Sequence, residues 1–187
     1  MIDSEVLLGE LKIVVTKLEA DILNRCREND AVDAPLRLEF DAAKQNNRTA
    51  VAYEVWRGEF ITQAAVAWVL ATVFVRFIED NGLLDARDEK RAWISGAKEE
   101  GEGRNQRLKM AQDTHLHYFR VNPSHTDREY LQWVFRTVCN PTGDRTVRAL
   151  EGLFDERHNP LWRVGVSGDG AALLLNFWQK VNPETGQ

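Results

Sequence analysis

Apolar residues recur every three or four positions along most of this chain, which is the periodicity of amphipathic α-helices. The first such stretch covers about residues 4–27 and begins at Asp3 or Ser4, either of which can serve as its N-cap. Its predicted inner face is formed by Leu7, Leu11, Val14, Leu18 and Ile22. A helix of this length with one apolar face is expected to fold back on the core of the protein or to pair with a partner helix.

Two further helices are predicted before residue 60. The first is expected to begin at Asp33 as its capping residue, with Pro35 in the first turn, where the missing N–H removes no helical hydrogen bond. It ends at the asparagine pair 46–47. Thr49 is expected to open the next helix, and Gly58 to mark a kink or a restart in it.

The strongest apolar pattern lies at about residues 60–81 and predicts a central helix that is ~32 Å long. Asn81 and Gly82 are typical of a helix C-terminus. One narrow face carries Thr62, Ala65, Val69, Thr72, Arg76 and Glu79. The rest of the helix surface, including Trp68, Leu70, Phe74 and Phe77, is expected to be enclosed by other helices. Arg76 can reach Glu79 and Asp80 along the helix, so we predict a structural ion pair among these three residues.

The second half of the chain predicts shorter helices separated by glycines and prolines. Helices are expected at about 87–94, 105–120 and 145–156, with a flexible internal connection at 96–104 and an extended segment at 161–166. Thr126 and Glu129 form a capping box that begins another helix, and a turn at Ser167 begins the last one, which runs to about Lys180. The sequence therefore predicts one all-α domain over 1–187, an irregular multi-helix bundle with little or no strand.

Composition narrows the possible functions. The formal net charge of the 187 residues is −5, so any contact with nucleic acid is expected to be local. The N-terminus lacks the basic region of a signal peptide, and the longest apolar run is too short to span a bilayer, which favours a cytoplasmic protein without a membrane partner. Cys26 and Cys139 are far apart, and we interpret them as buried or half-buried thiols in a reducing compartment.

Three groups of residues are candidates for binding. Arg104, Arg107 and Lys109 lie close together without an intervening acid, and they are our prediction for DNA-phosphate contacts, although a solvated surface is the default interpretation of such charges. Asp113, His115, His117 and His125 suggest a metal site, but histidines two positions apart on a helix point to different sides. The turn that begins at Ser167 is better interpreted as an N-cap than as a phosphate site.

The sequence contains none of several common catalytic motifs. There is no GxSxG motif and no Walker A loop, and Asn159-Pro160-Leu161-Trp162 lacks the second proline of the Asn-Pro-Pro-aromatic motif of amino-methyltransferases. A glycine-rich strand and turn for S-adenosylmethionine is missing as well. We therefore assign no catalytic, cofactor-binding or metal-binding residue to this chain.

Three blocks of sequence resemble a known family. They are residues 1–4 with the leucine-rich helix that follows, residues 63–83 with the segment VFVRFIEDNGL, and residues 159–178 from NPLWR to LLLNFW. In this order they resemble the N-terminal region of the phage-growth-limitation (PglX-type) adenine-specific DNA methyltransferases of type 2 bacteriophage-exclusion (BREX) systems. VFVRFIEDNGL is the most specific of the three, and similar blocks precede the catalytic domain of related restriction-modification adenine methyltransferases.

The resemblance implies that the chain is the N-terminal part of a larger enzyme. Such an enzyme transfers a methyl group from S-adenosylmethionine to N6 of adenine in DNA, with catalytic and cofactor motifs downstream of this region. The helical domain is then expected to hold DNA or to brace the catalytic domain, with DNA and other phage-defence proteins as partners. The alternative hypothesis is a non-catalytic protein–protein docking module of a defence complex, which binds through a helical face such as that of the first helix.

Overall fold

The computed structural model describes residues 4–84, 91–95, 106–139 and 154–180, and these residues confirm an all-α fold. The α-helices are α1 (Ser4–Glu28), α2 (Asp30–Gln45), α3 (Tyr53–Asp80), α4 (Gln106–Val121), α5 (Asp127–Cys139) and α7 (Gly168–Gln179). A short 3-10 helix, η1, covers Pro160–Trp162. The part of the chain that the structure describes contains no strand.

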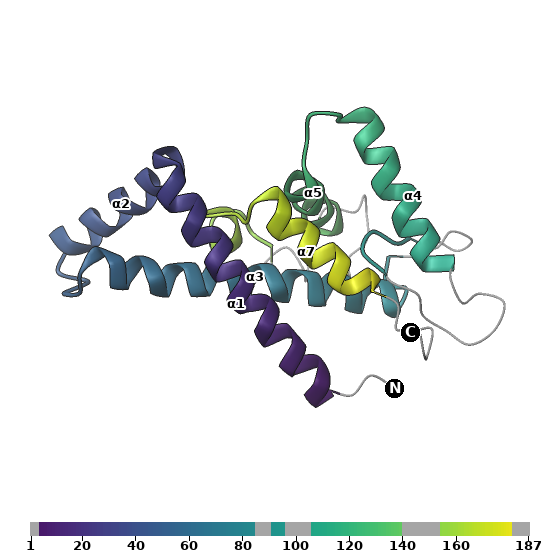
Figure 1. The fold of residues 1–187 in the computed structure, drawn as a ribbon, viewed down its shortest axis with the longest axis horizontal. Coiled ribbons are helices and arrows are strands. Elements are labelled where there is room, and N and C mark those ends of the chain that lie inside the picture. Colours follow the sequence, from purple (N-terminus) through teal and green to yellow (C-terminus); the bar gives the residue numbers. More distant parts are fainter. Residues whose placement is uncertain (1–3, 85–90, 96–105, 140–153, 181–187) are drawn as a thin grey trace.

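The helices are arranged around α3, which runs along the long axis of the molecule (Figure 1). Helix α1 crosses α3 and packs against it, and α2 returns from the end of α1 to the start of α3. Helices α5 and α7 pack against each other beside the C-terminal half of α3. Helix α4 contacts α5 through aromatic rings, with Tyr118 against Tyr130 and Trp133.

The apolar face predicted for the first helix is the face that packs on the core. Val14, Leu18 and Ile22 are buried, whereas Leu7 and Leu11, nearer the N-terminus, are half-buried. Both predicted cysteine environments are confirmed, because Cys26 is buried and Cys139 is half-buried, and neither forms a disulfide. The middle and C-terminal parts of the apolar face of α1 are therefore buried in the core and are not available to a partner helix.

Several predicted helix boundaries are wrong. Asn29, not Asp33, caps α2, and its side chain accepts a hydrogen bond from the N–H of Ala31 at 3.0 Å. Helix α3 begins at Tyr53 rather than at Thr49, and it continues through Gly58, where a side chain would meet no neighbour within 4 Å. A glycine in open space lowers helix propensity but does not break a helix that is buried on both sides of it.

Other boundaries are confirmed. Helix α2 ends at Asn46, followed by Asn47 with a positive φ of 54°, and α3 ends at Asn81, followed by Gly82 with a φ of 61°. The left-handed backbone at Gly82 suits a residue without a side chain. Helix α4 agrees with the prediction to within one residue, and α7 ends one residue before the predicted Lys180 but begins three residues before the predicted Ala171.

The segments between the later helices differ from the prediction where they are described. Residues 91–95 are not helical, and 85–90 lie outside the described residues. Residues 154–156 are also not helical, and most of the predicted helix at 145–156 lies outside the described part, as does the predicted connection at 96–104. The segment predicted to be extended at 161–166 begins inside η1, where Asn159 caps the turn through its side chain.

The burial of α3 agrees with the prediction in part. Trp68 is fully buried and Phe74 is half-buried, as predicted, and the narrow face is buried from Ala65 to Glu79. Leu70 and Phe77, expected to be enclosed, are exposed by 47% and 57% of their surface.

Of the described helices, only α3 is long and apolar enough to cross a membrane, judged by length and composition. In the structure, 56% of its most apolar 18-residue window is buried inside the protein, as in the core helix of a globular fold.

Candidate functional site

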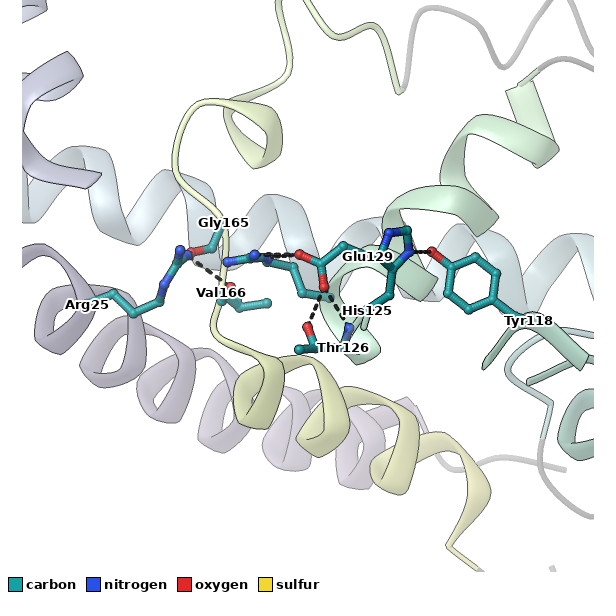
Figure 2. Close-up of polar contacts among 8 residues, drawn as sticks. Arg25, Tyr118, His125, Thr126, Glu129, Gly165 and Val166 are labelled. Carbon is teal, nitrogen blue, oxygen red and sulfur yellow. Dashed lines mark hydrogen bonds and ion pairs between the residues drawn. The ribbon is translucent and has the colours of Figure 1, made fainter. Parts of the chain in front are cut away.

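Two sets of polar contacts lie near each other: one joins α1 to the segment that leads into α7, and the other lies at the start of α5 (Figure 2). From α1, the Arg25 guanidinium donates to the backbone carbonyls of Gly165 and Val166, the latter at 3.0 Å. One turn earlier, Asp21 accepts a hydrogen bond from the N–H of Ser167 at 2.8 Å and from its hydroxyl at 2.5 Å. Helix α1 therefore fixes the backbone from which α7 begins.

The start of α7 is fully used by internal contacts. The Ser167 hydroxyl oxygen accepts a hydrogen bond from the N–H of Gly170 at 3.0 Å, which confirms the predicted N-cap. A side chain at Gly170 would place its first carbon 2.5 Å from a carboxylate oxygen of Asp21, so only glycine allows this close approach. Because Asp21 already supplies a negative charge at this helix N-terminus, these contacts stabilise the start of α7.

The set of contacts at the start of α5 is the predicted capping box. A Glu129 carboxylate oxygen accepts a hydrogen bond from the N–H of Thr126 at 2.8 Å, and its other oxygen accepts from Nε of Arg128 at 2.8 Å. Burial alone would raise the pKa of Glu129, but the hydrogen bonds from Thr126 and Arg128 outweigh it and lower the pKa to about 2. Burial and the nearby charge of Arg128 lower the pKa of Arg25, so the two guanidinium groups are held together against repulsion.

The histidines pair within the fold. His115 Nε2 lies 2.6 Å from Oδ1 of Asp127, and His125 Nδ1 lies 2.7 Å from the hydroxyl of Tyr118 (Figure 2). His117 is exposed on α4. Among the described residues, no three His, Cys, Asp or Glu side chains come together in a group that could hold a metal ion. Beside His115, a pocket of about 360 Å³ between α4 and α7 is lined in part by Gln112, Asn176 and Gln179.

The predicted ion pair is divided between two environments. Nη2 of Arg76 lies 3.1 Å from Oδ1 of Asp80, and both side chains are mostly buried. Glu79 points elsewhere: one of its oxygens accepts hydrogen bonds from the N–H groups of Trp93 and Ile94, at 2.5 and 2.9 Å, and the other accepts from the hydroxyl of Ser95. Burial raises the pKa of Glu79, partly offset by these hydrogen bonds and by the charge of Arg76.

The predicted DNA-phosphate contacts lie at the start of α4, as far as they are described. Arg107 is half-buried, and its Nη1 donates to the backbone carbonyl of Arg91 at 3.2 Å. Lys109 is exposed, and Arg104 lies outside the described residues. The first turn of α4 contains no acidic residue. The structure thus places Arg91 beside Arg107, a proximity that sequence spacing alone could not predict.

A buried acid at Asp33 was missed by the sequence analysis, which assigned it to a helix cap. Its carboxylate accepts hydrogen bonds from the Tyr53 hydroxyl at 2.7 Å, Nη1 of Arg57 at 2.9 Å and Nε of Arg37 at 2.8 Å. Burial would raise the pKa of Asp33, but these three hydrogen bonds lower it, whereas burial and Asp33 raise the pKa of Tyr53 to about 12. The i, i+4 spacing of Asp33 and Arg37 was the available signal.

The described part of the chain is thus an all-α region whose elements are joined by buried hydrogen bonds and ion pairs. Comparison with known proteins identifies the family of this region. The chain is 38% identical over 184 residues to the adenine-specific methyltransferase PglX of Streptomyces coelicolor. The match covers 98% of this chain and 14% of that relative, so the chain spans about one seventh of its length. This similarity confirms the resemblance seen in the sequence blocks: the chain is a PglX-type region.

Comparisons with protein-family models and with solved structures found no match. No model of a protein family matches the sequence. No solved structure matches it either.

Proposed function

We propose that this chain is a helical domain of an S-adenosylmethionine-dependent N6-adenine DNA methyltransferase that acts in bacterial phage defence in the cytoplasm. The observation that carries the proposal is the 38% identity over 98% of the chain to a protein named as an adenine-specific methyltransferase. Since the chain spans 14% of that relative, the catalytic groups and the S-adenosylmethionine site would be supplied by other parts of the full-length protein.

Within such an enzyme, the domain would brace the catalytic part and help to hold DNA. Bracing is supported by the hydrogen bonds of Asp21 and Arg25, which hold α1 to the distant start of α7, and by those of Glu79, which hold residues 93–95 against α3. The DNA contact would use Arg104, Arg107 and Lys109, because a few well-placed cations suffice for phosphate contacts even in a chain with a formal charge of −5. The bases themselves would be read elsewhere in the enzyme.

The alternative function is a non-catalytic docking module for other proteins of a defence complex. It is favoured by apolar residues that remain open near the N-terminus of α1, where Leu8 and Ile13 are exposed. The rest of the apolar face of α1 is buried on the core and gives this alternative no support. The two hypotheses differ in whether DNA is touched by the domain at all.

One experiment on the full-length gene product that contains this chain separates them. N6-methyladenine formation is measured with S-adenosylmethionine and DNA for the wild type and for a variant in which Arg104, Arg107 and Lys109 are replaced by Glu. DNA binding is measured in parallel at low and moderate salt. The variant is expected to bind DNA more weakly and to lose about 2 to 3 units from the slope of log K against log salt, since each phosphate contact contributes roughly one unit.

The matched control places two charge reversals, Lys12→Glu and Lys17→Glu, on the exposed side of α1. These are expected to leave the salt slope unchanged, apart from the weak effect of total charge. If the wild type forms no N6-methyladenine, the enzyme hypothesis fails. If it methylates DNA but both variants bind DNA as the wild type does, the DNA contact fails and the docking alternative stands.

A further inference from the structure

Helix α3 presents an apolar stripe to solvent, which we define as Val66, Leu70, Val73 and Phe77. Val66, Leu70 and Phe77 are 37%, 47% and 57% exposed, and Val73 is half-buried. Spacings of four, three and four place these side chains on one face over about three turns, or ~17 Å. This is the spacing of the contact seam between two packed helices.

The stripe contains no polar interruption. From residue 66 to residue 77, every residue of α3 that is exposed or half-buried is apolar, and the other two are Ala67 and Phe74. Polar residues return only at its ends, at Gln63 and at Asn81. The exposed side of α4 is different, since its two exposed apolar residues, Leu116 and Val121, are accompanied by exposed Lys109, Gln112, Asp113, His117 and Arg120. A continuous apolar face bounded by polar residues is typical of an interaction surface.

The charges near the stripe argue against a second copy of this chain as the occupant. Between residues 59 and 81, the exposed positions of α3 include Glu59 but no lysine or arginine. Arg76 is buried and paired with Asp80. If two copies packed α3 against α3 through this face, none of the exposed α3 positions from 59 to 80 would place a lysine or arginine opposite Glu59, in either relative direction of the helices.

The length of the relative indicates where an occupant would come from. The matched region is 14% of the PglX protein, so most of such a polypeptide lies outside this chain. We propose that the stripe is the surface on which a helix from the remainder of the same PglX-type polypeptide packs, with apolar residues at three- and four-residue spacing and a basic residue facing Glu59. This inference rests on the proposed function, because it requires the larger protein.

The test compares the 187-residue chain with the full-length gene product that contains it. Leu70→Cys is introduced with Cys139→Ser, which leaves buried Cys26 as the native thiol of this region. N-ethylmaleimide labelling at position 70 is followed by mass spectrometry of the peptide. Labelling should be at least about tenfold slower in the full-length product, because a covered thiol reacts only when the contact opens.

The control is Leu38→Cys on α2, the same chemical change at a position that is 71% exposed. It should label at similar rates in both proteins. Equal rates at position 70 in the two proteins would overturn the proposal, as would a gene product that ends at Gln187. Two results with the 187-residue chain would also overturn it. Protection that grows with its concentration would identify a second copy, and protection by phospholipid vesicles would identify a membrane. Methylation is measured separately, so loss of the proposed enzyme function is distinguishable from loss of this contact.

Discussion

The two faces of α3 carry different combinations of residues. The buried face is mostly apolar but also carries Thr72, Arg76 and Glu79, whereas the exposed face carries the apolar stripe. Each of these three side chains makes a polar contact: the Thr72 hydroxyl donates to the carbonyl of Val69 at 2.8 Å, Nη2 of Arg76 pairs with Asp80, and Glu79 binds residues 93–95. Burial here follows from available partners rather than from hydrophobicity, because a buried polar group is tolerated when it is hydrogen-bonded.

The largest effect is expected where the buried face depends on a single carboxylate. Glu79→Ala leaves the N–H groups of Trp93 and Ile94 buried without their acceptor, and each such group costs about 1 to 3 kcal/mol. We expect Glu79→Ala to lower the free energy of unfolding by about 4 kcal/mol, measured by urea denaturation of the 187-residue chain. Glu79→Gln keeps one acceptor oxygen and is expected to cost about half as much.

The same residue should give stability a dependence on pH. Burial raises the pKa of Glu79 in the folded chain above its ordinary value of 4.5. The folded state therefore holds this proton more tightly than the unfolded state, so the contribution is present below pH 4.5 and is lost as the pH rises through the folded pKa. Glu79→Gln should weaken the dependence of the free energy of unfolding on pH in this range. A loss below about 1 kcal/mol in Glu79→Ala would show that residues 93–95 do not depend on this carboxylate.

A smaller effect is expected at Asp33, which joins α2 to the start of α3. Asp33→Ala removes the partner of Arg57 and Tyr53, and we expect a loss of about 3 kcal/mol, in the range of a broken buried ion pair. Hydrogen bonds lower the pKa of Asp33 in the folded chain. Its contribution should therefore be present above pH 3.8 and be lost as the pH falls through the lowered pKa.

Asp30→Ala, on the exposed first turn of α2, is the matched control for this substitution. It should cost less than about 1 kcal/mol, the range expected for a charge near a helix N-terminus. Equal losses for Asp30→Ala and Asp33→Ala would mean that the buried hydrogen bonds of Asp33 contribute nothing beyond its position in the helix.

Local signals in the sequence predicted much of the fold. The ends of α2 and α3, the Ser167 cap and the Glu129 contact to Thr126 were predictable because each depends on residues fewer than five positions apart. The contact of Asp21 with Ser167 spans 146 positions, and the contact of Glu79 with Ile94 joins a helix to a non-helical segment. Neither kind of contact leaves a periodic signal, so the sequence could not predict it.

Leu70 and Phe77 of α3 were wrongly predicted to be enclosed, for a related reason. Helical periodicity shows which residues share a face, but it does not show which face meets the core when nearly all sides are apolar. Arg76 and Glu79 can be buried because Asp80 and residues 93–95 supply their partners. The exposed Leu70 and Phe77 could be recognised only once α1, α5 and η1 were placed around the helix.

The smallest effect is expected from Phe77→Ala in α3, and the neighbouring residue Ile78 gives the sharpest comparison for it. Ile78 is 1% exposed and Phe77 is 57% exposed. Ile78→Ala should destabilise the 187-residue chain by about 2 to 5 kcal/mol, as for other large-to-small changes in a core, whereas Phe77→Ala should cost less than about 1 kcal/mol. In the full-length gene product the difference between the two losses of stability should be smaller. A helix packed on the stripe would also bury Phe77, so that Phe77→Ala would become destabilising. Thermal unfolding of both variants in both proteins measures this. If Phe77→Ala costs as little stability in the full-length product as in the 187-residue chain, Phe77 is exposed in both proteins. The apolar stripe then has no partner in the larger protein.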